Sequence, residues 1–261
     1  MGFHRSHRGF KINPFELCRI RDLGDVGLTS MLDPNKAVID IQKFYQVIDQ
    51  SGTTPVSIGG DHSITLPILR ALAGVKSSRK GPIGMIHLDS HVDAYGRVAG
   101  IKEHCGSMFK ISLEEGLIDP SRTIQIGIRG AMGDLRQDDW AHNAGYRIIE
   151  IDEFNELGVE TVIAESRRIA GDGPTYVSWD LDVLDPVYAP AVADPETGGI
   201  SINEAIKFIR GLRGINIIGT DIVCFTPHLD ATRITALNAS SILHELVTII
   251  ADRISKNSPK K

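Results

Sequence analysis

Six short runs of apolar, largely β-branched residues, several ending directly in Asp, His or Gly, constrain most strongly how this chain can fold. The runs lie at residues 56–58, 83–88, 123–128, 146–151, 175–179 and 215–223. Continuous apolar runs of this kind are typical of strands that are buried on both faces, as in parallel sheets. We therefore expect the core of the protein to be built around such a sheet.

Amphipathic stretches with helical spacing lie between the apolar runs. They occupy residues 35–48, 63–72, 202–212 and 235–254. Ser63 and Ser201 are candidate N-caps, and Glu204 follows Ser201 in a capping-box pattern. Alternating strands and helices predict an α/β fold with a mostly parallel sheet and helices on both faces. The 261 residues are predicted to form a single domain over residues 1–261, because no linker or repeat divides them.

The composition excludes several classes of protein. Apolar residues make up 42% of the chain and the net charge is −5, so neither disorder nor binding to nucleic acid or an anionic membrane is expected. Cys18, Cys105 and Cys224 are far apart, which argues against a disulfide framework or a structural zinc site. The N-terminus lacks the apolar region of a signal peptide, and no apolar run approaches about 18 residues. A cytoplasmic enzyme that spans no membrane is the expectation.

Three clusters of acidic and histidine residues each follow a predicted strand. They read GGDHS at 59–63, HLDSHVD at 87–93 and SWDLDVLDP at 178–186. Ligands of parallel α/β sheets bind outside the carboxyl ends of the strands. Residues two apart on an extended segment point the same way, so these clusters can converge on one cavity.

Such a cavity would have the donors of a metal site. The candidate ligands are His62, Asp89, His91, Asp93, Asp180 and Asp182. Four crowded carboxylates repel one another unless cations neutralise them, and two divalent metals would do this. Oxygen-rich ligation favours Mn²⁺, with Zn²⁺, Fe²⁺, Co²⁺ or Ni²⁺ as alternatives. Two neighbouring metals lower the pKa of a shared water and so provide a hydroxide nucleophile at neutral pH.

Each of these residues also has an ordinary structural explanation. His62 alone could be a hydrogen-bonded histidine at a helix start, Asp182 and Asp185 could be turn or cap residues, and Asp93 could be a surface carboxylate. A shared function explains better why six potential ligands stand at three strand ends. His87 is interpreted as a buried strand histidine.

The three clusters resemble the motifs GGDH[ST], DAHxD and SxDxDxxDP of the ureohydrolase family, which includes arginase and agmatinase. The segments at 113–119, 125–129, 198–199 and 235–237 are most similar to the agmatinase branch. The resemblance implies a three-layer α/β/α fold and a trimer or hexamer of identical chains. It also implies two metals, usually Mn²⁺, held by the six residues above. The shared hydroxide would attack a guanidinium carbon, and the reaction would release urea and an amine. Asp93 would be placed to form a hydrogen bond with this hydroxide.

The chain departs from the family in the loop that usually supplies a histidine to the leaving amine. The family has an HGTxF-like loop, whereas this chain reads EHCGSMF at 103–109. Counting back from Phe109 puts Cys105 on the histidine position, with His104 one residue early. We predict that His104 is the proton shuttle. A loop histidine outside the site and a reactive Cys105 are the alternatives.

Further departures concern the substrate pocket. The family's VEVxP segment carries a Glu that pairs with the guanidinium, but here Cys224 replaces it and cannot form that charged pair. Agmatinases commonly have GTGTPE where this chain reads AVADPE at 191–196. The glycine-rich GxRxGPxxIR segment is absent, so the N-terminal segment is expected to be short relative to the family. Either it is truncated, or its start is misassigned, or part of the pocket is dispensed with. The substrate-binding residues stay undefined.

The sequence therefore predicts a binuclear metal-dependent hydrolase that cleaves a linear C–N bond of agmatine or a guanidino acid. One alternative is a different guanidine or amidine-type substrate. Another is a weakly active or inactive partner subunit of an active homologue, which retention of all six apparent ligands argues against. A metal-dependent deacetylase would need fewer carboxylates.

Overall fold

One six-stranded sheet forms the centre of the computed structural model, which describes residues 5–30, 32–131 and 136–257. Its strands are β1 (Val56–Ile58), β2 (Ile83–Leu88), β3 (Ile118–Ile128), β4 (Arg147–Glu150), β5 (Thr175–Asp180) and β6 (Ile217–Val223). They lie in the order β1-β6-β5-β2-β3-β4, and all neighbouring pairs are parallel. The predicted parallel sheet is confirmed.

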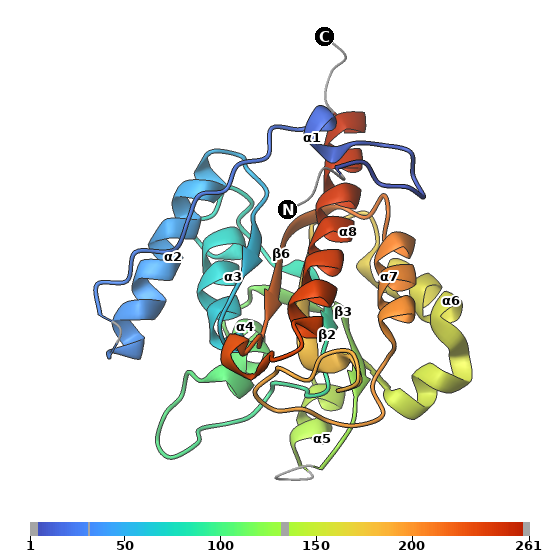
Figure 1. The fold of residues 1–261 in the computed structure, drawn as a ribbon. Helices are drawn as coiled ribbons and strands as arrows, with labels where there is room; N and C mark the ends of the chain where they lie inside the picture. Colours follow the sequence, from blue (N-terminus) through green and yellow to red (C-terminus); the bar gives the residue numbers. More distant parts are fainter. Residues whose placement is uncertain (1–4, 31, 132–135, 258–261) are drawn as a thin grey trace.

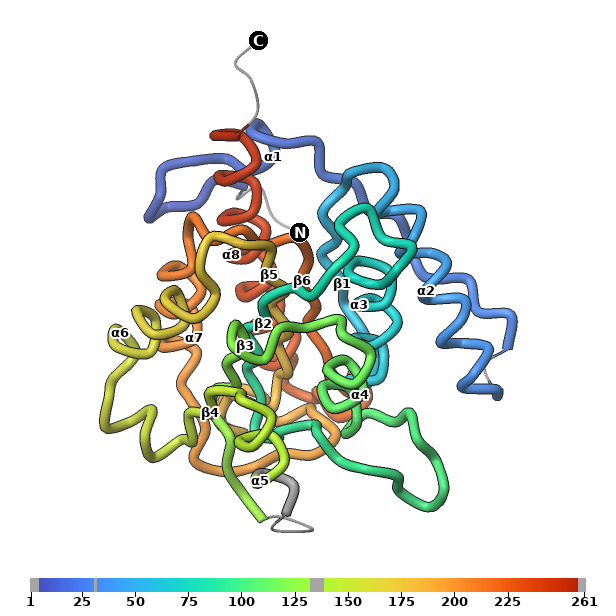
Figure 2. Tube along the Cα trace, turned by 180° about the vertical axis from the view of Figure 1, so that it is seen from behind, coloured from blue at the N-terminus to red at the C-terminus, as the bar shows by residue number. Residues whose placement is uncertain are grey.

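Helices cover both faces of this sheet (Figures 1 and 2). One layer contains α2 (Pro34–Gln50), α3 (Thr65–Ala73), α4 (Met108–Glu114) and α5 (Arg136–Asn143). The other contains α6 (Ile151–Ala170), α7 (Ile202–Gly211) and α8 (Ile234–Asn257), with the short α1 (Pro14–Leu17) beside α8. The predicted three-layer α/β/α architecture is thereby confirmed.

Each face of the sheet has its own apolar core. Side chains of α6, α7 and α8 pack with one set of strand residues, including the fully buried Trp179. Side chains of α2, α3 and α4, among them the fully buried Phe109 of α4, pack with the other set, which includes the fully buried Tyr176. β2 and β5 are buried along their whole length, which explains why their sequences are almost continuously apolar.

Local sequence signals account for several helix boundaries. Ser201 and Glu204 form the expected capping box at the start of α7. Ser63 does not cap a helix; instead, the Asp61 side chain accepts a hydrogen bond from the Ser63 backbone at the start of a short 3₁₀ turn. The sequence analysis did not single out α6, whose helical pattern is interrupted at Gly158 by a left-handed backbone (φ 73°).

The helix α8 is long and apolar enough, by length and composition, to cross a membrane, but half of its most apolar window is buried inside the fold. It packs against α7, α1 and β6. Burial against a sheet and a neighbouring helix is what a core helix of an α/β fold requires. The length and apolar character of α8 are explained by this packing.

The order of the strands positions the functional residues. β6 lies between β1 and β5, and β5 lies beside β2. Because all the strands are parallel, the segments that follow β1, β6, β5 and β2 emerge at the same edge of the sheet. In Figure 1 the loops after β2 and β5 gather at the lower end of the molecule, away from α1 and the C-terminal part of α8.

Candidate metal centre

The carboxylate of Asp89 joins two histidines at the carboxyl edge of the sheet. Its Oδ2 atom lies 3.1 Å from Nδ1 of His62, and its Oδ1 atom lies 3.3 Å from Nδ1 of His91. Asp89 directly follows β2. His62 follows β1, which is separated from β2 in the sheet by β5 and β6. The fold therefore brings separate clusters together, with one carboxylate between two halves of a site.

The first half is centred on Nδ1 of His62. This atom also lies 3.0 Å from Oδ2 of Asp93 and 3.2 Å from Oδ2 of Asp180. It is buried and has no well-formed hydrogen bond among the described residues. A nitrogen that faces three carboxylate oxygens without a hydrogen bond has the surroundings of a metal ligand.

The other nitrogen of His62 is held by a buried hydrogen-bond chain. The Ser178 hydroxyl donates to Oδ1 of Asp221 at 2.7 Å, and Nε2 of His62 lies 2.8 Å from the same hydroxyl. Since serine has one hydroxyl proton, its oxygen accepts from Nε2–H of His62. Nδ1 of the neutral ring is then left with its lone pair, which is the form that binds a cation.

The second half is centred on Nδ1 of His91, which lies 3.2 Å from Oδ2 of Asp182. Oδ1 of Asp182 accepts a hydrogen bond from the Ser90 backbone at 2.9 Å, and Oδ1 of Asp180 accepts one from the Asp182 backbone at 2.9 Å. Each of these two aspartates thus has one oxygen fixed by the main chain and the other directed towards a histidine.

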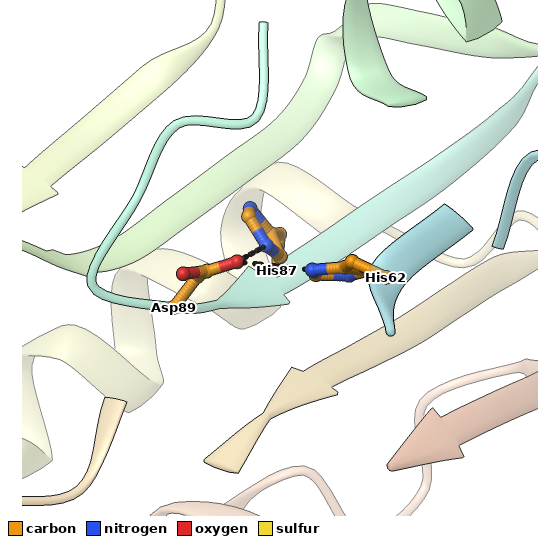
Figure 3. A group of neighbouring side chains, drawn as sticks. All are labelled: His62, His87 and Asp89. Carbon is orange, nitrogen blue, oxygen red and sulfur yellow. Dashed lines mark hydrogen bonds and ion pairs between the residues drawn. The ribbon is translucent and has the colours of Figure 1, made fainter. Parts of the chain in front are cut away.

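His87 is fully buried in β2, as the sequence indicated. Its Nε2 atom lies 2.8 Å from Oδ2 of Asp89, as Figure 3 shows, and its Nδ1 atom lies 3.0 Å from the Gln125 side-chain amide. With Gln125 as donor, Nε2–H of His87 donates to Asp89. His87 therefore orients this carboxylate and stands beside His62, close enough that His62, His87 and Asp89 form one compact group of donors.

Burial and neighbouring charges shift the pKa values of several groups in the centre. Burial, followed by the charges of Asp180 and Asp89, raises the pKa of Asp182 well above its usual range. Burial and the charge of Asp89 also raise the pKa of Asp93. Although burial alone lowers it, hydrogen bonds to Asp182 and Asp89 raise the pKa of His91 to about 12. Burial and mutual repulsion thus disfavour full ionisation of these carboxylates.

The residues of the centre fit a divalent-metal site. The donors are carboxylate oxygens and imidazole nitrogens, a set that suits Mn²⁺ and also Zn²⁺, Fe²⁺, Co²⁺ or Ni²⁺. His62 offers a lone pair that no hydrogen bond uses, and the histidines and carboxylates are steered by Ser178, His87 and main-chain N–H groups. Such outer hydrogen bonds are typical of metal sites. All six residues singled out from the sequence lie in this centre, and their role as ligands remains a prediction.

The loop after β2 places His104 and Cys105 differently. Nε2 of His104 lies 2.9 Å from the Gly96 carbonyl oxygen, within the loop itself. Cys105 is exposed as a residue, but its sulfur is partly buried. This partial burial, followed by the charges of Asp93 and Asp61, raises the pKa of the Cys105 thiol. The charges of the acidic centre therefore affect the Cys105 thiol. The proton-shuttle role of His104 remains a prediction.

Cys224 follows β6 and lies at the centre itself. Burial, followed by the charge of Asp180 and a hydrogen bond to that carboxylate, raises the pKa of the Cys224 thiol. The donor atoms of His62, Asp180 and Cys224 form a second compact group. From the sequence, Cys224 was interpreted only as the replacement of a substrate-binding residue. Its proximity to the metal-type donors could not be predicted without knowing the order of the strands.

Arg129 also contributes to the site without having been recognised from the sequence as a functional residue. Its guanidinium donates to the carbonyl oxygens of Asp182 and Glu196, both at 2.7 Å, and to that of Thr197 at 3.1 Å. Arg129 thereby fastens the loop after β5 to the end of β3. The many donors of a guanidinium suit this task.

The fold and the acidic centre together define a parallel α/β/α protein with a metal-type site at the carboxyl edge of its sheet. Residues 3–248 match the Arginase family, and the chain belongs to that family. The ureohydrolase resemblance of its motifs is thereby confirmed, and so is the class of enzyme.

Individual relatives agree with this assignment. The chain is 42% identical to a guanidinopropionase of Pseudomonas aeruginosa over 97% of this chain and 78% of that protein. It is 37% identical to a mitochondrial agmatinase of Gallus gallus over 91% of this chain and 68% of that protein. Its structure is similar to that of a proclavaminate amidino hydrolase from Streptomyces clavuligerus, with a TM-score of 0.87, 33% identity, and coverage of 96% and 81% of the two chains.

Proposed function

We propose that this protein uses two divalent metal ions to hydrolyse a small guanidino compound to urea and an amine. The observation that carries the proposal is the arrangement around Asp89, whose two carboxylate oxygens face Nδ1 of His62 and Nδ1 of His91. Asp89 would therefore help to hold cations together with both histidines.

The reaction divides between the metals and the chain. When bound, two divalent cations would supply the acidity that water needs to become a nucleophile at neutral pH. The water oxygen adds to the guanidinium carbon, the C–N bond to the substituent breaks, and the amine leaves with a proton. Asp93, whose buried carboxylate lies 3.0 Å from His62, would hold the attacking water by a hydrogen bond.

Departure of the amine requires a proton donor outside the acidic centre. We assign this role to His104, as the sequence suggested. The 3₁₀ turn that begins after His104 packs against the turn that carries His62, so the loop lies beside the centre. His104 would have to exchange its hydrogen bond with Gly96 for one to the departing amine.

The substrate belongs to the guanidino acids or to agmatine. Support comes from the names of relatives, which include a guanidinopropionase, a guanidinobutyrase and agmatinases. Cys224 cannot form a charged pair with the guanidinium, so recognition must rest on other groups.

Urea release tests this proposal. Protein loaded with Mn²⁺ or Ni²⁺ would be assayed with agmatine, arginine, guanidinobutyrate, guanidinopropionate, guanidinoacetate and free guanidine. Turnover of at least one compound is expected, together with two metals per chain. His62→Ala should lose both metal and turnover, whereas His228→Ala, in a surface turn, should lose neither. Two bound metals without any turnover would contradict the proposal and favour a partner subunit or another amidine-type substrate.

The location, the assembly, the partners and the principal metal belong to the same proposal. We place the protein in the cytoplasm as a trimer or hexamer of identical chains, without nucleic-acid or membrane partners, and we take Mn²⁺ as the principal metal because oxygen donors dominate the centre. Light scattering of the purified protein and elemental analysis of protein made without added metal would test the assembly and the metal.

A further inference from the structure

We propose that Cys224 is an additional metal ligand, whose sulfur joins His62 and Asp180 in one half of the centre. A sulfur donor would bias this half towards Zn²⁺, Co²⁺, Ni²⁺ or Fe²⁺, while the His91 half keeps only oxygen and nitrogen donors. This inference rests on the metal-dependent function proposed above and adds to it a residue that lies outside the three acidic and histidine clusters.

The strand order places Cys224 between the other donors. β6 pairs with β1 on one side and with β5 on the other, so that Ile222 lies opposite Ile58 and Val223 opposite Asp180. Cys224 directly follows β6 and thus stands between the segments that carry His62 and Asp180. One donor atom from each of these three residues lies within 4.8 Å of the other two.

An independent observation at His62 points to a ligand at this place. Nδ1 of His62 is buried, and no hydrogen bond among the described residues uses its lone pair. The chain through Ser178 and Asp221 keeps that lone pair available. A cation bound at Nδ1 and at the Asp180 carboxylate would therefore lie in the group of donors that includes the Cys224 sulfur.

The backbone holds Cys224 in place. Its N–H donates to the Gly60 carbonyl at 2.7 Å, which ties it to the segment that precedes His62. Its φ of 66° lies in the left-handed region, which is uncommon for residues other than glycine, asparagine and aspartate. The local fold thus accepts a strained backbone that presents a side chain at this point.

The chemistry of binding is balanced without any further reactant. A bound divalent metal replaces the thiol proton, which passes to solvent, and one metal–sulfur bond forms. No oxidation occurs. Cys105 is exposed on the loop after β2 and belongs to no such donor group among the described residues, so it is a matched control. Cys18, whose thiol contacts the Ala251 carbonyl at 3.5 Å, is a remote control.

Cobalt(II) absorption tests the inference, because sulfur bound to Co²⁺ produces an intense near-ultraviolet charge-transfer band that oxygen and nitrogen ligands lack. The full chain would be stripped of metal and titrated with Co²⁺. We expect the band in the wild-type protein, in Cys105→Ser and in Cys18→Ser, and its loss in Cys224→Ser. In competition, Cys224→Ser should lower the preference for Zn²⁺ over Mn²⁺ by at least about tenfold, the smaller effect typical of changes around a metal site.

The outcomes separate this inference from the proposed function. Two bound Co²⁺ per chain without the band, or a band that Cys224→Ser retains, would overturn the role of Cys224 and leave the metal centre standing. Failure of the wild-type protein to bind metal would overturn both. If Cys224→Ser does not fold, the ¹¹³Cd resonances of the wild-type protein decide, since a sulfur ligand shifts one of them far downfield and oxygen and nitrogen donors alone do not.

Discussion

The hydroxyl of Ser178 decides which nitrogen of His62 is free. It lies 2.8 Å from Nε2 of His62 and gives its only proton to Asp221. Asp221 is fully buried and also accepts the hydroxyls of Thr65 and Tyr176 at 2.7 and 2.8 Å. Three hydroxyl groups thus donate to this one carboxylate, so that the histidine is oriented by a buried hydrogen-bond network.

Replacement of Ser178 should therefore weaken metal binding without removing any ligand. Ser178→Ala removes the acceptor that fixes the tautomer of His62, and it leaves Asp221 with one hydrogen bond fewer. We expect metal affinity to fall about 10–100-fold, as is typical when an outer hydrogen bond to a metal ligand is lost. Isothermal titration of the metal-free protein measures this. Ser112→Ala is the control, because Ser112 is also buried but its hydroxyl has no hydrogen bond among the described residues. Equal affinities of the two variants would contradict the role of Ser178.

A second prediction concerns Arg129 and the loop after β5. A lysine cannot reach the several carbonyls that the guanidinium holds, so Arg129→Lys should loosen Asp182 and lower metal affinity in the His91 half. Arg122→Lys is a matched control, because Arg122 holds the Ala170 carbonyl by two hydrogen bonds at a distance from the centre. Both variants should lose about 1–3 kcal/mol of stability, but only Arg129→Lys should lose metal. A metal content unchanged in Arg129→Lys would refute this.

The loop at 103–109 yields a third prediction. If His104 donates the proton to the leaving amine, His104→Ala should reduce turnover about 10²–10⁴-fold while both metals stay bound. Cys105→Ser should keep most of the activity. Measurements of urea release and metal content on both variants test this. The opposite pattern, with Cys105→Ser impaired and His104→Ala active, would transfer the role to Cys105.

Removal of metal should destabilise the protein. Cations that bind only the folded state add about 2.7 kcal/mol of stability at a free concentration one hundred times their dissociation constant. A chelator should therefore lower the melting temperature, and added Mn²⁺ should restore it. Asp182→Asn, which removes one charge from the centre, should show a smaller response. A melting temperature that does not respond to chelation in a protein shown to have released its metal would count against the proposed site.

A fifth prediction concerns pH and lies far from the centre. Glu245 of α8 accepts hydrogen bonds from Arg210 and His7 at 2.6 and 2.8 Å. Although burial alone raises it, these partners hold the pKa of Glu245 below its ordinary value. The stability that these partners add to the fold is then complete above the pKa of Glu245 in the unfolded chain, about 4.3. It is lost as the pH falls through the lower pKa of the folded protein.

Glu245→Gln should therefore cost about 1.5–3 kcal/mol in urea denaturation at pH 7 and at pH 5. The difference from the wild-type protein should shrink below about pH 4.3. Glu160→Gln is the control, since Glu160 pairs with Lys207 on the surface, where ion pairs contribute little. A difference that grows on acidification would show that the sign is wrong.

Some of the regular elements could be predicted from the sequence with correct bounds and others could not. The strands at 56–58 and 83–88 coincide with β1 and β2, because their apolar runs are bounded by Gly, Pro and Asp. The run at 123–128 is only the second half of β3, which begins at Ile118, since the residues before Thr123 are polar and partly exposed. The helix α6 went unrecognised because Gly158 breaks its period.

The sequence by itself determined the parallel α/β class and the acidic and histidine donors, because buried strands and strand-end clusters leave local patterns. It could not show which clusters meet. That β6 lies between β1 and β5, and so brings Cys224 to His62 and Asp180, was decided only by the strand order. The same holds for the support that Ser178, Asp221 and Arg129 give to the centre. Hydrogen bonds between residues far apart in the chain depend on packing, and packing has no local signature in the sequence.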